Sequence, residues 1–316
     1  MKTLNHISQS LYEELRASGS GPGILYGLPK VHKANFKSEK LYRPIFAAYN
    51  CASYNLSKYL VKILNPFAEN QYTIKNSAEF RREIEQLSCN HDYVMASFDI
   101  KDLYTNIPLR ESIQIAMNLI DANVFNIPHS LFQKMLELSV YNTMFKFDGI
   151  YYRQVDGLGM GLPLSPTLAN IFLCFHETTW LQNCPEDFKP VFFKRYMDDT
   201  FAVFRNKNHV NSFLQYLNDK HQNITFTHEE EDHGRLPFLD CMVSRTCDRF
   251  TTSVYRKPTF SGLGLSFFSF SPIIYKINSI KTLIFRANNI SSTFTSLNKE
   301  ISKLVAYFMR MVIQNL

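Results

Sequence analysis

Residues 193–204 read FKRYMDDTFAVF, which places two adjacent carboxylates, Asp198 and Asp199, between two short runs of apolar and aromatic residues. Runs of this composition and length favour β-strands, and Asp favours turns, so the stretch predicts a β-hairpin with the Asp-Asp pair at its turn. Two carboxylates held side by side repel each other unless a cation lies between them. The stretch therefore predicts a divalent-metal site, or the solvated turn that an isolated acidic hairpin usually forms.

A third carboxylate, Asp99, ends an earlier strand-like run, VMASFD at residues 94–99. If the two strands are neighbours in one sheet, Asp99 and Asp198 meet at the same edge and can hold two Mg²⁺ ions. Metals about 4 Å apart clamp the attacking and leaving oxygens of a phosphoryl transfer. We expect Asp99 and Asp198 to be the main metal ligands and catalytic residues, with Asp199 in support.

Between these acids lies a glycine-rich loop, GLGMGLPLSPTLANI at residues 157–171. Glycine lets the backbone approach a ligand closely, and Pro166 suits the first turn of the apolar helix that follows. An acidic strand, a glycine loop with its helix and an acidic hairpin, in this order, are typical of the palm of a polymerase.

The combination resembles the reverse transcriptases, with residues 97–108, 157–171 and 196–199 similar to their motifs A, B and C. Four further stretches look like the Penelope-like retroelement enzymes, a group related to telomerase: YGLPKVHK at 26–33, RPI at 43–45, PFLD at 237–240 and VYRKPT at 254–259. The resemblance covers residues 24–316. It implies an α+β right hand with fingers, an antiparallel-sheet palm and a helical thumb.

The resemblance also implies residues that bind the incoming nucleotide. Tyr104 follows Asp99 by five residues, where reverse transcriptases place the side chain that crowds the sugar 2′-position; the alternative is a core tyrosine. Arg43 and Lys30 would contact the triphosphate. Met160 stands where many reverse transcriptases have Gln. The full set of nucleotide-binding residues that we expect is Lys30, Arg43, Tyr104, Met160, Gly161 and Pro163.

A second set of residues is expected to bind nucleic acid. It combines cations, which suit the phosphate backbone, with an aromatic ring on which a base can stack. Its members are Lys33, Tyr255, Arg256, Lys257 and Lys303. The alternative for the segment at 255–257 is an exposed basic strand without a ligand.

These features imply RNA-directed DNA synthesis from a primer 3′-end. The implied cofactors are two Mg²⁺ ions, with Mn²⁺ as a substitute, and the partners are an RNA template, a DNA primer and deoxynucleoside triphosphates. The alternative is a catalytically silent or domesticated nucleic-acid-binding remnant of a retroelement. A nuclear location follows from this activity alone, and the sequence does not indicate an oligomeric state.

Composition agrees with a large folded protein. The 316 residues are 45% hydrophobic and 20% charged, as in globular proteins, and the net charge of +6 favours a polyanionic partner. No apolar run approaches about 18 residues, so the sequence predicts no membrane span. The six cysteines form no Cys-x-x-Cys pair. His228, His233, Cys241 and Cys247 are an alternative zinc site, although their spacings are looser than those of known ligand patterns.

We expect four regions: a flexible segment at 1–23, fingers at 24–90, a palm with fingers elements at 91–248, and a primer-grip region and thumb at 249–316. Periodicity predicts two strands within 24–50 and helices within 51–90 and 111–142 that cover the palm sheet. It also predicts hairpins at 145–152 and across 236–256, a helix at 209–219, a strand at 224–228 and a thumb helix at 301–313.

Overall fold

The computed structural model describes residues 7–17, 19–30, 41–120, 127–141, 143–246, 248–260, 262 and 264–313. The chain forms two compact units, each assembled from three separate segments. The first contains Met1–Tyr72, Ile100–Cys184 and Tyr216–Phe226, and the second contains Thr73–Asp99, Pro185–Gln215 and Thr227–Leu316. The four regions expected from the sequence remain a prediction.

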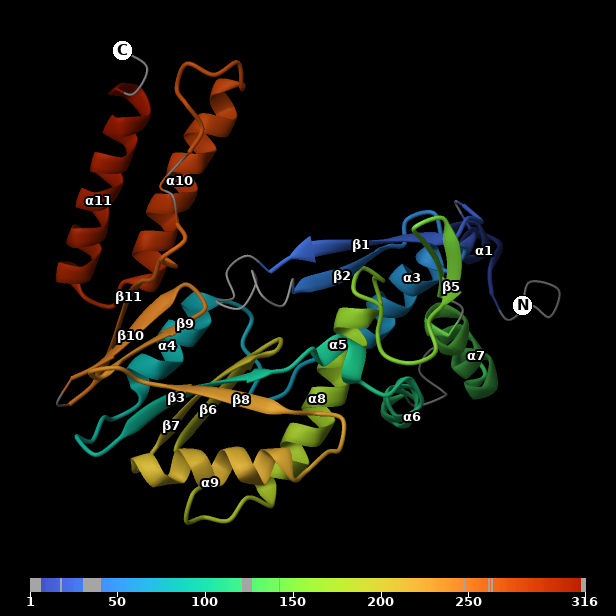
Figure 1. The fold of residues 1–316 in the computed structure, drawn as a ribbon, viewed down its shortest axis with the longest axis horizontal. Helices are drawn as coiled ribbons and strands as arrows, with labels where there is room; N and C mark the ends of the chain where they lie inside the picture. The colour runs from blue at the N-terminus through green and yellow to red at the C-terminus, as the bar shows by residue number, and fades with distance from the viewer. Residues whose placement is uncertain are drawn as a thin grey trace. The chain divides into compact units, whose positions relative to one another are not determined.

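The first unit combines one mixed sheet with a set of helices (Figure 1). Its elements are α1 (Gln9–Leu15), β1 (Gly23–Pro29), β2 (Tyr42–Ala47), α3 (Tyr54–Leu64), the 3-10 helix η2 (Asn65–Phe67), α5 (Leu103–Asn106), α6 (Leu109–Leu119), α7 (His129–Val140), β4 (Met144–Phe147), β5 (Ile150–Arg153) and α8 (Ser165–Gln182). The strand order is β2-β1-β4-β5, in which β1 runs antiparallel to β2 and parallel to β4.

The second unit contains two antiparallel sheets. Its elements are α4 (Ser77–Gln86), β3 (Val94–Ile100), β6 (Phe192–Tyr196), β7 (Asp199–Phe204), α9 (Lys207–Asn218), β8 (Phe226–Glu230), β9 (Arg235–Phe238), β10 (Cys241–Arg245), β11 (Phe250–Val254), α10 (Ile273–Ile290) and α11 (Phe294–Ile313). The central sheet has the order β6-β7-β3-β8, and the smaller sheet has the order β11-β10-β9.

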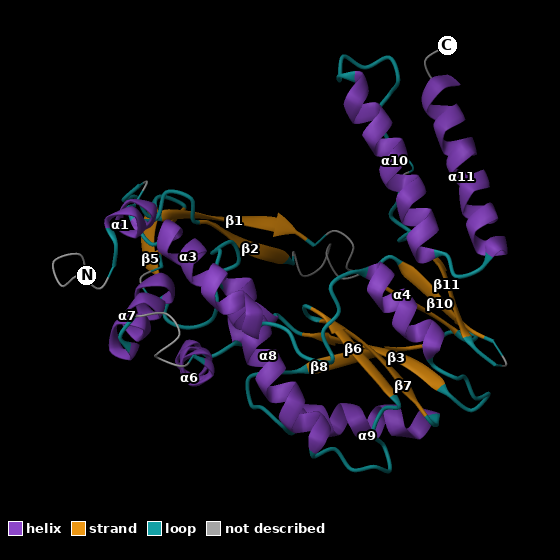
Figure 2. Ribbon diagram, turned by 180° about the vertical axis from the view of Figure 1, so that it is seen from behind, coloured by secondary structure: helices purple, strands orange, loops and turns teal. Residues whose placement is uncertain are grey.

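Aromatic side chains from α4 and both sheets form the core of the second unit. Phe80 of α4 is fully buried, with its ring centroid 5.0 Å from Phe201 of β7 and 4.7 Å from Phe238 of β9. Helix α9 lies along the opposite face of the central sheet (Figure 2). There Phe213 of α9 contacts the rings of Phe98 and Phe204. Buried aromatic pairs add to the hydrophobic stabilisation, so this core stabilises the central sheet.

Most of the predicted elements are confirmed, including the β4–β5 hairpin with Asp148 and Gly149 at its tip. Both tip residues have positive φ, at 48° and 81°, as tight hairpin turns require. The prediction for residues 236–256 was incomplete, because the segment forms three strands with Leu239 and Asp240 at the first turn. The expected cover of the palm sheet by helices is confirmed for α4, whose Phe80 packs on Phe201 of the sheet, and otherwise stays a prediction. Of the helices predicted there, α4 belongs to the unit that holds the sheet, whereas α3, α6 and α7 belong to the first unit.

The sequence analysis also missed α10. This helix contains six isoleucines, which β-branching makes poor helix formers, and several of its apolar residues are exposed. Ile273, Ile277, Ile280 and Ile284 nevertheless recur at helical spacing, so the sequence does carry the signal for this helix, although the face that they form is exposed. On α11, Leu304 is buried, whereas Val305 and Met309 are exposed. No helix in the described residues is long and apolar enough to cross a membrane.

Candidate functional site

The three predicted catalytic acids all lie at one end of the central sheet of the second unit. β3 and β7 pair antiparallel, and their register places Asp99 directly opposite Asp199. Asp198 immediately precedes β7, in the turn that joins it to β6. Asp99 and Asp198 are half-buried and Asp199 is exposed. The structure therefore brings together acids separated by about a hundred residues, as the sequence predicts.

The hairpin is confirmed, but its two-residue turn consists of Met197 and Asp198, since Tyr196 and Asp199 are paired strand residues. Met197 adopts φ = 56°, a left-handed conformation that is uncommon for a side chain of its size. The fully buried guanidinium of Arg195 donates a hydrogen bond of 2.9 Å to the Met197 carbonyl. This contact, which the sequence analysis missed, supports the strained turn that positions Asp198.

The arrangement of the acids suits divalent cations. Carboxylates directly opposite each other on paired strands destabilise a sheet by repulsion, and Asp198 adds a third negative charge beside them. Oxygen donors concentrated in this way are the ligands that Mg²⁺ and Mn²⁺ prefer. Bound cations at this position would activate a hydroxyl nucleophile and neutralise the charge of a departing phosphate group.

The glycine loop belongs to the first unit, where two backbone hydrogen bonds hold it. Leu158 N–H donates to the Tyr104 carbonyl at 2.6 Å, and Phe46 N–H of β2 donates to the Met160 carbonyl at 2.7 Å. Gly161 adopts φ = 120° and packs so closely that an added Cβ would lie 2.1 Å from the Phe46 carbonyl oxygen. The structure thus joins the loop, the helix that carries Tyr104 and the strand that carries Arg43.

The other expected nucleotide-binding residues also lie in the first unit. Arg43 is exposed on β2, opposite Leu28 of β1. Lys30 is half-buried, and its ammonium group donates to an Asp102 carboxylate oxygen at 3.1 Å. Asp102 occupies the N-cap position of α5, but its side chain makes no capping hydrogen bond. Pro163 is half-buried between the loop and α8.

Comparison with known proteins identifies the family. A family model for reverse transcriptase (RNA-dependent DNA polymerase) matches residues 31–231, which is more than half of the 316 residues. The chain belongs to the reverse transcriptase family. A search of curated proteins finds no match.

Solved structures with the same fold include two telomerases. The telomerase from Candida albicans, in complex with a fragment of telomeric RNA, aligns with a TM-score of 0.62 and 12% identity, over 96% of this chain and 56% of that chain. The apo telomerase from Candida tropicalis aligns with a TM-score of 0.57 and 12% identity, over 98% of this chain and 62% of that chain. This reverse transcriptase thus spans less than two thirds of either telomerase. The shared fold confirms the predicted α+β right-hand architecture.

The expected nucleic-acid residues of this reverse transcriptase lie in different surroundings. Lys257 and Lys303 are exposed and Tyr255 is half-buried. Arg256 forms a bidentate ion pair with the buried carboxylate of Glu300, which joins the segment after β11 to α11. Lys33 lies outside the described residues.

The alternative zinc site of the sequence analysis does not form among the described residues. Burial raises the pKa of the Cys241 thiol to about 12, so it stays protonated, and its sulfur faces the Ser77 carbonyl. His233 is exposed, His228 stacks on Phe98, and Cys247 lies outside the described residues. Among the described residues, a different group of three potential ligands is close together: Glu111, His176 and His221.

Proposed function

We propose that this reverse transcriptase is an RNA-directed DNA polymerase that extends a primer 3′-end by two-metal nucleotidyl transfer. The observation that carries the proposal is the placement of Asp99, Asp198 and Asp199 at one end of an antiparallel sheet. The cations, Mg²⁺ with Mn²⁺ as a substitute, would be held by Asp99 and Asp198, with Asp199 beside them. The substrates would be an RNA template, a DNA primer and deoxynucleoside triphosphates.

The direct test is primer extension by the purified protein on an RNA template, with Mg²⁺ and with a chelator. Metal-dependent extension would support the proposal. Template binding without extension under any divalent-metal condition would instead identify a silent nucleic-acid-binding remnant.

We further propose that the enzyme comes from a Penelope-like retroelement. This rests on the residues at 26–33, 43–45, 237–240 and 254–259, together with the fold shared with telomerase. A phylogenetic tree of reverse transcriptase domains built on residues 31–231 would test it. Placement of this chain outside the Penelope-like group would contradict the proposal.

Tyr104→Ala should let the enzyme accept ribonucleotides. The half-buried ring would crowd the sugar 2′-position, and its removal should relieve a clash of about 1–3 kcal/mol, or roughly 5- to 150-fold in discrimination. The backbone contact of Tyr104 with Leu158 does not depend on the ring. Steady-state incorporation of dCTP and CTP measures the effect. Tyr104→Phe keeps the ring and should retain discrimination; equal discrimination in the wild type and Tyr104→Ala would place the 2′-selectivity elsewhere.

Substitution of Arg43 should affect binding of the nucleotide, whereas substitution of the exposed lysines of the second unit should affect binding of the template-primer. Arg43→Ala should raise the KM for the nucleotide without changing the salt dependence of template-primer binding, because its phosphate contact is local. Replacing Lys257 and Lys303 together should weaken template-primer binding. It should also lower the slope of log affinity against log salt concentration by about 2, because binding releases about one counterion fewer for each phosphate contact that is lost. Binding titrations at several salt concentrations, with nucleotide kinetics, measure both effects.

Two features of the chain sharpen this experiment. Arg256 is left unchanged, because loss of its buried pair with Glu300 would cost about 3–5 kcal/mol of stability and confuse the result. Lys134→Ala, which removes an exposed lysine on α7, controls for net charge. Because Lys134→Ala removes one charge and the double variant removes two, a change in salt slope half as large in Lys134→Ala would show that the two lysines act only through overall charge.

A further inference from the structure

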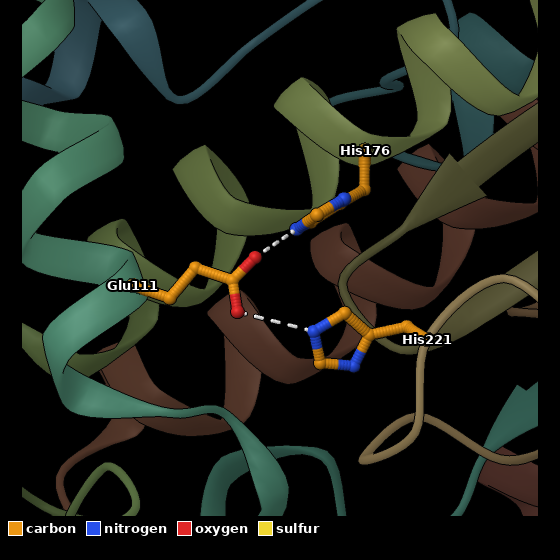
Figure 3. Close-up of side chains that lie close together, drawn as sticks. All are labelled: Glu111, His176 and His221. Carbon is orange, nitrogen blue, oxygen red and sulfur yellow. Dashed lines mark hydrogen bonds and ion pairs between the residues drawn. The ribbon is translucent and has the colours of Figure 1, made fainter.

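Three potential metal ligands converge inside the first unit, apart from the acids of the polymerase site. Glu111 comes from α6, His176 from α8, and His221 from the turn after α9 (Figure 3). The Nε2 atom of His176 lies 2.9 Å from Oε1 of Glu111, and the Nε2 atom of His221 lies 3.1 Å from Oε2. One ligand atom from each residue lies within 4.8 Å of the other two. Both imidazoles therefore point at one carboxylate.

The two histidines of the cluster are largely buried, whereas the glutamate reaches solvent. The side chains of His176 and His221 are only 14% and 11% exposed, whereas that of Glu111 is 37% exposed. Phe172 and Trp180 pack on the His176 ring, with centroids at 4.5 and 5.2 Å. Burial lowers the pKa of His176, which favours the neutral imidazole that binds metals. An ion can thus enter beside Glu111 while the rings hold the two nitrogens in place.

The hydrogen bonds define the protonation of the cluster without metal. The backbone N–H of Asn223 donates to Nδ1 of His221 at 3.1 Å, so Nδ1 carries a lone pair and the neutral ring has its proton on Nε2. A metal at Nε2 requires this proton to move to Nδ1, which breaks the bond from Asn223. The loss of one hydrogen bond is small beside the free energy with which structural zinc sites bind their ion.

We propose that Glu111, His176 and His221 form a Zn²⁺ site, with water from the exposed side completing four-coordination. Two imidazole nitrogens and one carboxylate oxygen are a donor set that zinc binds, whereas Mg²⁺ and Ca²⁺ prefer oxygen ligands alone. Tetrahedral bonds near 2.1 Å separate ligand atoms by about 3.4 Å. The two nitrogen–oxygen contacts therefore have to open by a few tenths of an ångström, and the three ligand atoms, which lie within 4.8 Å of one another, have to adjust to that spacing. The ion would join α6, α8 and the turn after α9 within the first unit.

The test uses the full chain with zinc as the only transition metal, in excess Mg²⁺ that occupies the acids of the second unit. Equilibrium dialysis with metal analysis should give one Zn²⁺ per chain, and Co²⁺ in its place should show the visible absorption of tetrahedral coordination. His176→Gln and His221→Gln should each weaken binding by about 100-fold or more. The matched control is His233→Gln, since this histidine is exposed and belongs to the second unit.

Two further measurements separate ligation from a structural effect. Glu111→Gln retains the shape of the side chain but removes the charge, so it should weaken Zn²⁺ binding while circular dichroism confirms the fold. In the wild type, the NMR resonance of the Asn223 backbone amide should shift when zinc is added. The reason is that its hydrogen-bond acceptor, Nδ1 of His221, becomes protonated. If the wild type takes up no Zn²⁺, or if His176→Gln and His221→Gln bind it as the control does, the cluster is only hydrogen-bonded and the proposal is wrong.

Discussion

Asp99→Asn or Asp198→Asn should abolish primer extension while template-primer binding persists. Each replacement keeps the shape of the side chain but removes a charge from the end of the sheet where Asp99 and Asp199 face each other. A loss of metal ligation should cost at least several kcal/mol of transition-state stabilisation, or about a thousandfold or more in rate. Single-turnover extension on an RNA template, with template-primer affinity measured in parallel, separates chemistry from binding.

Two companion variants make this result specific. Asp232→Asn removes a carboxylate with a 93% exposed side chain in the same unit and should leave extension unchanged. Asp199→Asn should have the smaller effect that a supporting role implies. Near-wild-type rates for Asp99→Asn or Asp198→Asn would show that the metal assignment is wrong, and a loss for Asp199→Asn equal to that for Asp198→Asn would overturn the ranking of the ligands.

Gly161→Ala should cause the second large effect, on both stability and extension. The added Cβ would lie 2.1 Å from the Phe46 carbonyl oxygen, on a residue with φ = 120°. Strain and backbone displacement together should cost about 3–5 kcal/mol. The displaced loop would also lose the hydrogen bond from Phe46 to Met160. Urea unfolding and primer extension measure the two consequences.

Gly149→Ala is the matched control. Gly149 also has a positive φ, of 81°, but a Cβ there would meet nothing within 4 Å. The Gly149→Ala protein should therefore lose only about 1–2 kcal/mol of stability, because the alanine has to adopt a left-handed conformation, and it should keep its activity. Equal losses of stability in the two variants would show that the contact with β2 contributes nothing beyond backbone strain.

The residues of the polymerase site could be predicted because their signals are local. The acids end or join short apolar strands, and Pro166 lies at the start of α8, so composition and spacing alone predict the strands, the turn and the helix. The order of these motifs predicted the family and the right-hand fold. Neighbouring residues were sufficient for these predictions because strand alternation, turn formation and helix initiation depend mainly on chemistry within a few residues.

The tertiary structure decided which distant residues meet. It places Asp199, and not Asp198, opposite Asp99, buries Arg195 beneath the acidic turn, and pairs Arg256 with Glu300. It also joins Glu111 to His176 and His221, which lie 65 and 110 residues further along the chain. These contacts depend on sheet register and on how helices pack, and neither is encoded in a short stretch of sequence. The sequence by itself therefore determined which residues could do chemistry, and packing determined which of them act together.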